Sequence, residues 1–222
     1  MNSPLIPPFY GVACLVTLWL LILWLVARAS PRGLSRREKL VVGLSTMVVL
    51  VLPVGGLPVW AWAFSICPNP SMPLLGTICA ALWPRLGGVR IFKAADWRAT
   101  WIFGAAAGTV LYFQPVYLSG SDFYFWGWHH QAAIWVLAGT AGLFLACGNR
   151  LGLLLLVALL AYEFQGLESR NAWDYAIDPV FWLISVTLGT IHFVRKGLAR
   201  KLRPIRAQAG PVQADAVLVA AE

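Results

Sequence analysis

The sequence predicts an all-α fold, a polytopic transmembrane helical bundle of about seven helices with its N-terminus outside and its C-terminus cytoplasmic. Of its 222 residues, 59% are hydrophobic and only 12% are charged, and its mean hydropathy is +0.72. A soluble domain of this length needs more polar surface. Several uncharged apolar runs approach the roughly 17–25 residues of a membrane-spanning helix, in which every backbone polar group is satisfied internally.

The candidate spans follow one another with short polar connections between them. They are Phe9–Ala27, Leu40–Ser65, Met72–Trp83, Thr100–Leu118, His130–Cys147, Leu151–Phe164 and Pro179–Val194. The first has no charge before it and Arg28 just after it, so we expect a retained helix rather than a cleavable signal peptide. The second is overlong, and the Pro and Gly residues between Pro53 and Pro58 predict a kink or a break.

The third candidate span is short, and the distribution of positive charge indicates whether it crosses the membrane. If it crosses, the basic connections 28–39, 85–98 and 148–150 and the tail from 195 all lie on one side, with 16 of the 17 Lys and Arg residues. If it does not cross, either the basic tail or the first basic loop falls on the wrong side. Basic residues prefer the cytoplasmic side, so the charge pattern favours seven helices.

Local signals predict how some helices pack, begin and end. Gly104 and Gly108 in "GAAAG" share one helix face, a pattern that allows close helix packing. Asp178 followed by Pro179 predicts the N-cap and first residue of the last helix, which we expect to end at 195–196. The domain prediction is a single integral membrane domain over 1–206 and a disordered cytoplasmic tail over 207–222.

Two polar segments are expected to lie together on the outer side. They are "SGSDFYFWGWHH" (119–130) and "EFQGLESRNAWDYAIDP" (163–179), and they hold two of the three histidines and five of the nine carboxylates. The fifth and sixth spans are joined by a minimal turn at 148–150, so the two segments cap neighbouring helices. We therefore expect them to meet in space and to form the candidate site.

The residue types in these segments suggest either acid–base chemistry or a binding surface. The catalytic candidates are Glu163, Asp174, His129 and His130, because histidine titrates near neutral pH and a carboxylate can orient it. Glu163 directly follows an apolar run, at a depth where an ionisable group is costly and often functional. The candidates for substrate or partner binding are Asp122, Glu168, Asn171 and Trp173.

Structural roles remain open for most of these residues. Asp122 and Asp178 could serve as helix caps, and Trp173 could belong to an interfacial aromatic belt. Adjacent residues on a helix point about 100° apart, so His129 and His130 are poorly placed to share a metal ion. No metal site and no cofactor is predicted, because the cysteines form no CxxC and no nucleotide-binding or hydrolase motif occurs.

Two hypotheses for function follow. The first is a non-catalytic subunit or accessory factor of a bacterial envelope complex for secretion, conjugation or surface-polymer assembly. Its expected partners in the inner membrane are the lipid bilayer and other membrane proteins. The alternative is a membrane-embedded enzyme whose outward-facing carboxylate and histidine site acts on a lipid or lipid-linked substrate. A transporter is disfavoured by the lack of repeated halves, and nucleic-acid binding by scattered basic residues without a matching fold signature.

Overall fold

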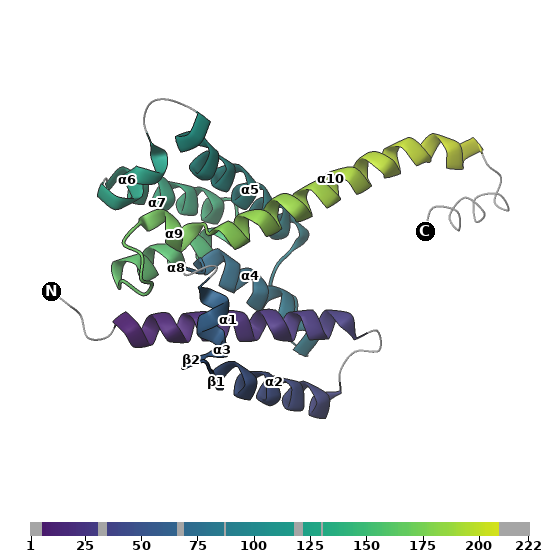
Figure 1. The fold of residues 1–222 in the computed structure, drawn as a ribbon. Coiled ribbons are helices and arrows are strands. Elements are labelled where there is room, and N and C mark those ends of the chain that lie inside the picture. Colours follow the sequence, from purple (N-terminus) through teal and green to yellow (C-terminus); the bar gives the residue numbers. More distant parts are fainter. Residues whose placement is uncertain are drawn as a thin grey trace.

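The computed structural model describes residues 6–30, 35–65, 69–86, 88–117, 122–129 and 131–208, and it confirms the all-α fold class (Figure 1). In chain order the elements are α1 (Ile6–Ala29), α2 (Arg36–Val51), β1 (Pro53–Val54), β2 (Leu57–Pro58), α3 (Val59–Phe64), α4 (Met72–Leu82), the 3-10 helix η1 (Trp83–Leu86), α5 (Ala94–Tyr117), α6 (Phe123–His129), α7 (Gln131–Ala146), α8 (Leu151–Glu163), α9 (Ala172–Ala176) and α10 (Pro179–Gln208). Among the described residues, no helix has both the length and the apolar character needed to cross a bilayer.

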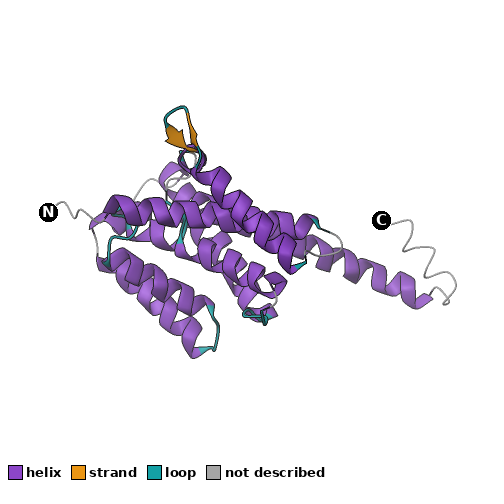
Figure 2. Cartoon of the chain, turned by 90° about the horizontal axis from the view of Figure 1, so that it is seen from below, coloured by secondary structure: helices purple, strands orange, loops and turns teal. Residues whose placement is uncertain are grey.

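The predicted break in the second span is confirmed. Between α2 and α3 the chain forms a two-residue hairpin in which Pro53 pairs with Pro58 and Val54 with Leu57, and which projects from the bundle in Figure 2. Gly55 and Gly56 form the turn with φ of 60° and 86°. Positive φ at both central residues is what a tight hairpin turn requires, and glycine adopts it without steric cost.

One predicted helix end was wrong, and another helix begins before its candidate span. α5 begins at Ala94 rather than Thr100, because the Asp96 carboxylate accepts a hydrogen bond of 2.8 Å from the backbone N–H of Lys93 and so stabilises an earlier first turn. α10 continues to Gln208 rather than ending at 195–196, because Arg, Lys, Leu and Ala dominate the basic stretch and favour helix. All but the first two residues of the predicted tail 207–222 lie outside the described residues.

The prediction of close packing at "GAAAG" is confirmed by the contact between α5 and α10. A Cβ placed on Gly104 would lie 2.9 Å from the Cβ of Ser185, and one on Gly108 would lie 2.7 Å from Cγ of Trp182. Real Cβ atoms do not approach that closely, so glycine is what lets the two helix backbones come together. This contact brings the start of α10 against the bundle.

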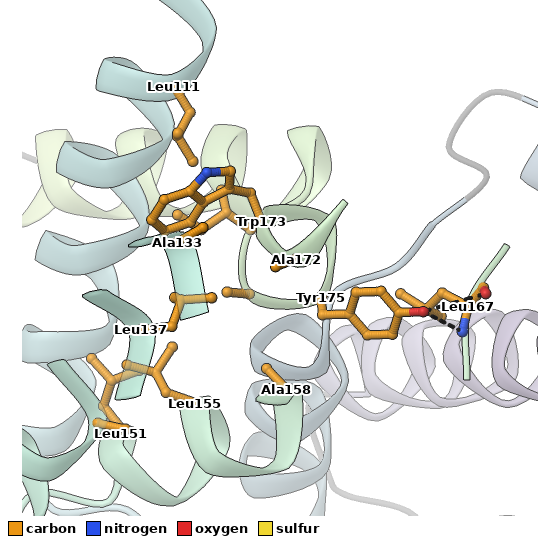
Figure 3. Close-up of a cluster of buried hydrophobic side chains, with 13 residues drawn as sticks. Leu111, Ala133, Leu137, Leu151, Leu155, Ala158, Leu167, Ala172, Trp173 and Tyr175 are labelled. Atoms are coloured by element: carbon orange, nitrogen blue, oxygen red, sulfur yellow. Dashed lines mark hydrogen bonds between the residues drawn. The ribbon is translucent and has the colours of Figure 1, made fainter. Parts of the chain in front are cut away.

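The main apolar core lies where α5, α7 and α8 meet the connection between α8 and α10 (Figure 3). Leu137, Leu151 and Leu155 are fully buried there against Trp173 and Tyr175, which come from that connection. The connection therefore folds into the bundle rather than over its surface.

Hydrogen bonds show which connections lie together at each end of α8. At one end Asn149 Nδ2 donates to the carbonyl of Ala95 at 3.4 Å and the backbone N–H of Arg150 donates to Asp96 at 3.1 Å, so two of the basic connections meet. At the other end the backbone N–H of Ser71 donates to Asp178 at 2.8 Å. The acidic connection thus lies at the opposite end of α8 from the connection at 148–150.

Candidate functional site

The candidate site is built on residues 163–178, here called the 163–178 segment, together with α6. The segment leaves α8 through Gln165, which has a φ of 51°. The backbone N–H of Gln165 donates to the carbonyl of Tyr162 at 2.9 Å, and that of Gly166 donates to Ala161 at 2.8 Å. These bonds satisfy the free carbonyls at the helix end and reverse the chain sharply.

Asn171 organises the centre of the segment. Its side-chain Oδ1 accepts from the backbone N–H of Trp173 at 2.9 Å and so caps α9, while its Nδ2 donates to the carbonyl of Tyr124 in α6 at 3.1 Å. Its own backbone N–H donates to Oγ of Ser169 at 3.0 Å. With Asn171 fully buried, one side chain fixes both the start of α9 and its position against α6.

Asp174 lies between two hydroxyl donors. Its Oδ1 accepts from the Tyr124 hydroxyl at 2.8 Å, and its Oδ2 accepts from Oγ of Ser169. Burial raises the pKa of Asp174, an effect that the hydrogen bonds from Ser169 and Tyr124 partly offset. Burial, followed by the negative charge of Asp174, also raises the pKa of Tyr124, so its hydroxyl keeps its proton and donates at neutral pH.

Trp173 and Gly127 form the contact between the segment and α6. The indole Nε1 of Trp173 donates to the carbonyl of Phe123 at 2.9 Å, and the ring is almost fully buried. A Cβ on Gly127 would overlap Oδ1 of Asn171 and would lie 2.6 Å from Cδ1 of Trp173. Position 127 therefore requires a glycine.

Tyr175 holds the first half of the segment in place. Its hydroxyl accepts from the backbone N–H of Leu167 at 3.1 Å (Figure 3). It also lies 3.0 Å from the carbonyl of Ser169, to which it can donate. Burial raises the pKa of Tyr175, which keeps this donor protonated. The backbone N–H of Ser169 in turn donates to the side-chain oxygen of Asn69 at 3.3 Å, and this bond ties the segment to the start of α4.

Asp178 has the capping role that the sequence suggested and a second role that it did not. Its Oδ1 accepts from the backbone N–H of Phe181 at 2.8 Å, as an N-cap of α10 does. Its Oδ2 accepts from the backbone N–H of Ser71, the N-cap residue of α4. Burial raises the pKa of Asp178, and its hydrogen bonds from Ser71 and Phe181 act in the opposite direction.

The other residues that the sequence predicted for the candidate site are not seen to come together in one place. Asp122 is exposed and caps α6, accepting from the backbone N–H groups of Tyr124 at 2.9 Å and Phe125 at 3.2 Å. Glu163 and Glu168 are exposed, and within the described residues no side chain pairs with either carboxylate. His130 and the side chain of His129 lie outside what the structure describes.

The hydrogen bonds among these residues fix the shape of the 163–178 segment. Asp174, Asn171 and Asp178 are buried or nearly so, and their oxygens already accept hydrogen bonds from the protein. Among the described residues, no trio of His, Cys, Asp and Glu is placed to hold a metal ion. Sequence reasoning missed Tyr124, Ser169, Tyr175 and Gly127. One usable signal was present, because Asn171 with Asp174 three residues later is a pattern that predicts the start of α9.

Comparisons with protein-family models, with curated proteins and with solved structures found no match to this chain.

Proposed function

We propose that this chain is a multi-pass inner-membrane subunit without a catalytic centre of its own. It serves as an accessory factor in a bacterial envelope complex for secretion, conjugation or surface-polymer assembly. Its docking surface is formed by the exposed side chains of Glu163, Phe164, Glu168 and Arg170 at the outer end of the bundle.

The membrane part of the proposal is supported by the distribution of apolar and polar side chains. Large apolar side chains face outward on several helices, with Leu40 on α2 64% exposed, Trp135 on α7 71% exposed and Leu143 on α7 64% exposed. Charged and amide side chains such as Asp96 and Asn171 are instead buried. A helix that faces water has its polar side outward, whereas lipid favours the pattern seen in this chain.

The choice of end is supported by charge. The basic connections gather at the end formed by 85–98 and 148–150, and basic residues prefer the cytoplasmic side. The 163–178 segment and the start of α4 lie together at the opposite end. The same reasoning assigns this second end to the outside.

One observation carries the docking role: the buried residues of the 163–178 segment hold its shape, while a few side chains between 163 and 170 point to solvent. Asp174 and Asn171 bind α6, and Tyr175 binds the segment's own backbone. Phe164 is 80% exposed beside Glu163, and a rigidly held exposed aromatic next to charges is typical of a binding surface.

Site-specific cross-linking tests the docking role. A photoreactive residue at Phe164 should link the chain to one larger envelope protein, and the same residue at Val89 should not. Val89 is also 80% exposed but lies in the basic connection between η1 and α5, so it is a matched control. The adduct should weaken when Glu168 is changed to Lys. Equal linkage from both positions, or none from 164, would refute the docking surface.

Reporter fusions test the membrane topology independently. A fusion after Gly88 should report a cytoplasmic location, and a fusion after Gly166 an external one. The same location for both reporters would contradict the assignment of the two ends.

A further inference from the structure

A large cleft runs along α4 and reaches the basic connection that holds Arg85 and Arg90. A cavity of about 510 Å³ lies between α1, α4, α5 and α10. A second, of about 780 Å³, adjoins it along α5 and α10 and shares Trp97, Trp101 and Leu188 with it. The rings of Trp97 and Trp101 stack with their centroids 5.4 Å apart and form a continuous apolar wall between the two. Both volumes fall in the range of about 300–1,000 Å³ that is typical of ligand pockets.

Two arginines line the first cavity, and no carboxylate among the described residues pairs with either of them. The guanidinium Nη1 of Arg85, in η1, is buried and has no hydrogen-bond partner among the described residues. Arg90 is exposed, and no described carboxylate pairs with it either. Asp96, which lies close in sequence, has its two oxygens occupied by the backbone N–H groups of Lys93 and Arg150.

An unpaired buried guanidinium N–H is costly, because a charged donor loses its water without gaining an acceptor. An anion at this place would restore the missing bond, and the planar fork of an arginine matches the oxygens of a phosphate. Arg85 also lines a smaller cavity of about 150 Å³ together with Lys39. Arg85 therefore shares the lining of one cavity with Arg90 and of the other with Lys39.

The other residues that line the first cavity indicate the chemical character of the rest of the ligand. The first cavity is walled mainly by aliphatic and aromatic side chains, which include Leu21, Trp24, Ile78, Phe92 and Ile184. A free inorganic ion would leave these walls unfilled. A ligand with an anionic head and a long apolar body satisfies both parts of the cleft.

We propose that this cleft binds an anionic phospholipid, with its phosphate at Arg85 and Arg90 and an acyl chain along the wall of Trp97 and Trp101. The second cavity adds Arg98 and Arg195, so a lipid with net negative charge is preferred over a zwitterionic one, whose own cation these residues repel. The lipid comes from the cytoplasmic leaflet, because the basic end faces that side in the proposed topology. The site goes beyond the docking function and uses the opposite end of the molecule.

The test uses the purified full-length chain in a non-ionic detergent with added lipids. Phosphatidylglycerol carrying brominated acyl chains should quench the tryptophan fluorescence in a saturable way, and brominated phosphatidylcholine should bind about tenfold more weakly or worse. Arg90→Gln should lower the affinity for phosphatidylglycerol several-fold, and Arg85→Gln about tenfold or more. Arg36→Gln removes the same charge from an exposed position at the start of α2, outside the lining of these cavities, so it is the matched control and should bind like the unchanged chain.

A second variant and a competition experiment make the lipid-binding test decisive. Arg90 is exposed, so its replacement is expected to fold even if that of Arg85 does not. Inorganic phosphate in large excess should not displace the lipid; full displacement would show a free-phosphate site instead and overturn the proposal. Equal binding of both lipids, or unchanged binding by Arg90→Gln, would overturn it as well. None of these results depends on the outer docking surface, which is tested separately by cross-linking.

Discussion

The hydroxyl of Tyr124 donates a 2.8 Å hydrogen bond to the carboxylate of Asp174, 50 residues further along the chain. This bond joins α6 to α9, and Asn171 supports it by donating to the carbonyl of Tyr124 itself. The two polar segments that the sequence placed on the same side of the molecule therefore meet through specific contacts. The buried contacts of the 163–178 segment, and the lack of space for a side chain at position 127, give predictions about stability that do not require a known activity.

Removing the Tyr124 hydroxyl should destabilise the protein measurably. Tyr124→Phe leaves Asp174 with one donor fewer in a largely buried place and should cost about 1–2 kcal/mol. Tyr162→Phe is the control, because the ring of Tyr162 also packs on the segment, against Tyr175, but no described hydrogen bond uses its hydroxyl. Thermal unfolding in detergent measures both variants. Equal midpoints would show that the bond to Asp174 contributes nothing.

The raised pKa values of Asp174 and Asp178 predict a dependence of stability on pH. Each carboxyl binds its proton more tightly in the folded than in the unfolded state, whose value lies near the ordinary 3.8. The folded state therefore holds more protons between the ordinary and the raised value, so stability falls as pH rises through that window and levels off above it. Unfolding midpoints from about pH 4 to about pH 8 measure this slope. Asp174→Asn should flatten it, and a steeper slope in that variant would contradict the assignment.

Gly127→Ala should loosen the contact between α6 and the 163–178 segment. The added methyl group overlaps the Asn171 side chain, which is held by bonds on both sides and cannot move away freely. We expect a loss of about 1–3 kcal/mol, the usual cost of overpacking. Gly139→Ala on α7 is the matched control, because nothing lies within 4 Å of the added atom and alanine favours helix. Limited proteolysis near residue 165 should accelerate in the first variant only.

Structural features that depend on a few neighbouring residues could be predicted from the sequence. Asp178 with Pro179 predicted the start of α10, and Gly55 with Gly56 predicted the break after α2, because each effect acts within a few residues. The pairing of Gly104 with α10 could be inferred only as a tendency, since the pattern does not name its partner helix.

The arrangement of the site could not be predicted in the same way. α6 and α9 have seven and five residues, too few for a helical period to stand out in an apolar sequence. The partners of Asp174 depend on how α6 packs, and Ser169 looks like any loop serine until the chain is folded. The four acidic residues of the segment differ in their exposure to solvent. Asp174 and Asp178 turn inward, while Glu163 and Glu168 face solvent. Sequence alone treated all four as one cluster.

Glu163→Gln separates the docking hypothesis from the catalytic one by the size of its effect. Glu163 is exposed at the end of α8, so losing its charge should change stability by less than about 0.5 kcal/mol. At the edge of a docking surface the change should weaken partner cross-linking from residue 164 by less than about tenfold and leave envelope assembly working. A general base or acid at this place would instead lose roughly 10²–10⁴-fold in rate. Complementation of a deletion strain, with protein levels checked by immunoblotting, measures the outcome. A null phenotype at normal protein level would favour the enzyme, because a single exposed charge at a protein contact does not account for so large a loss.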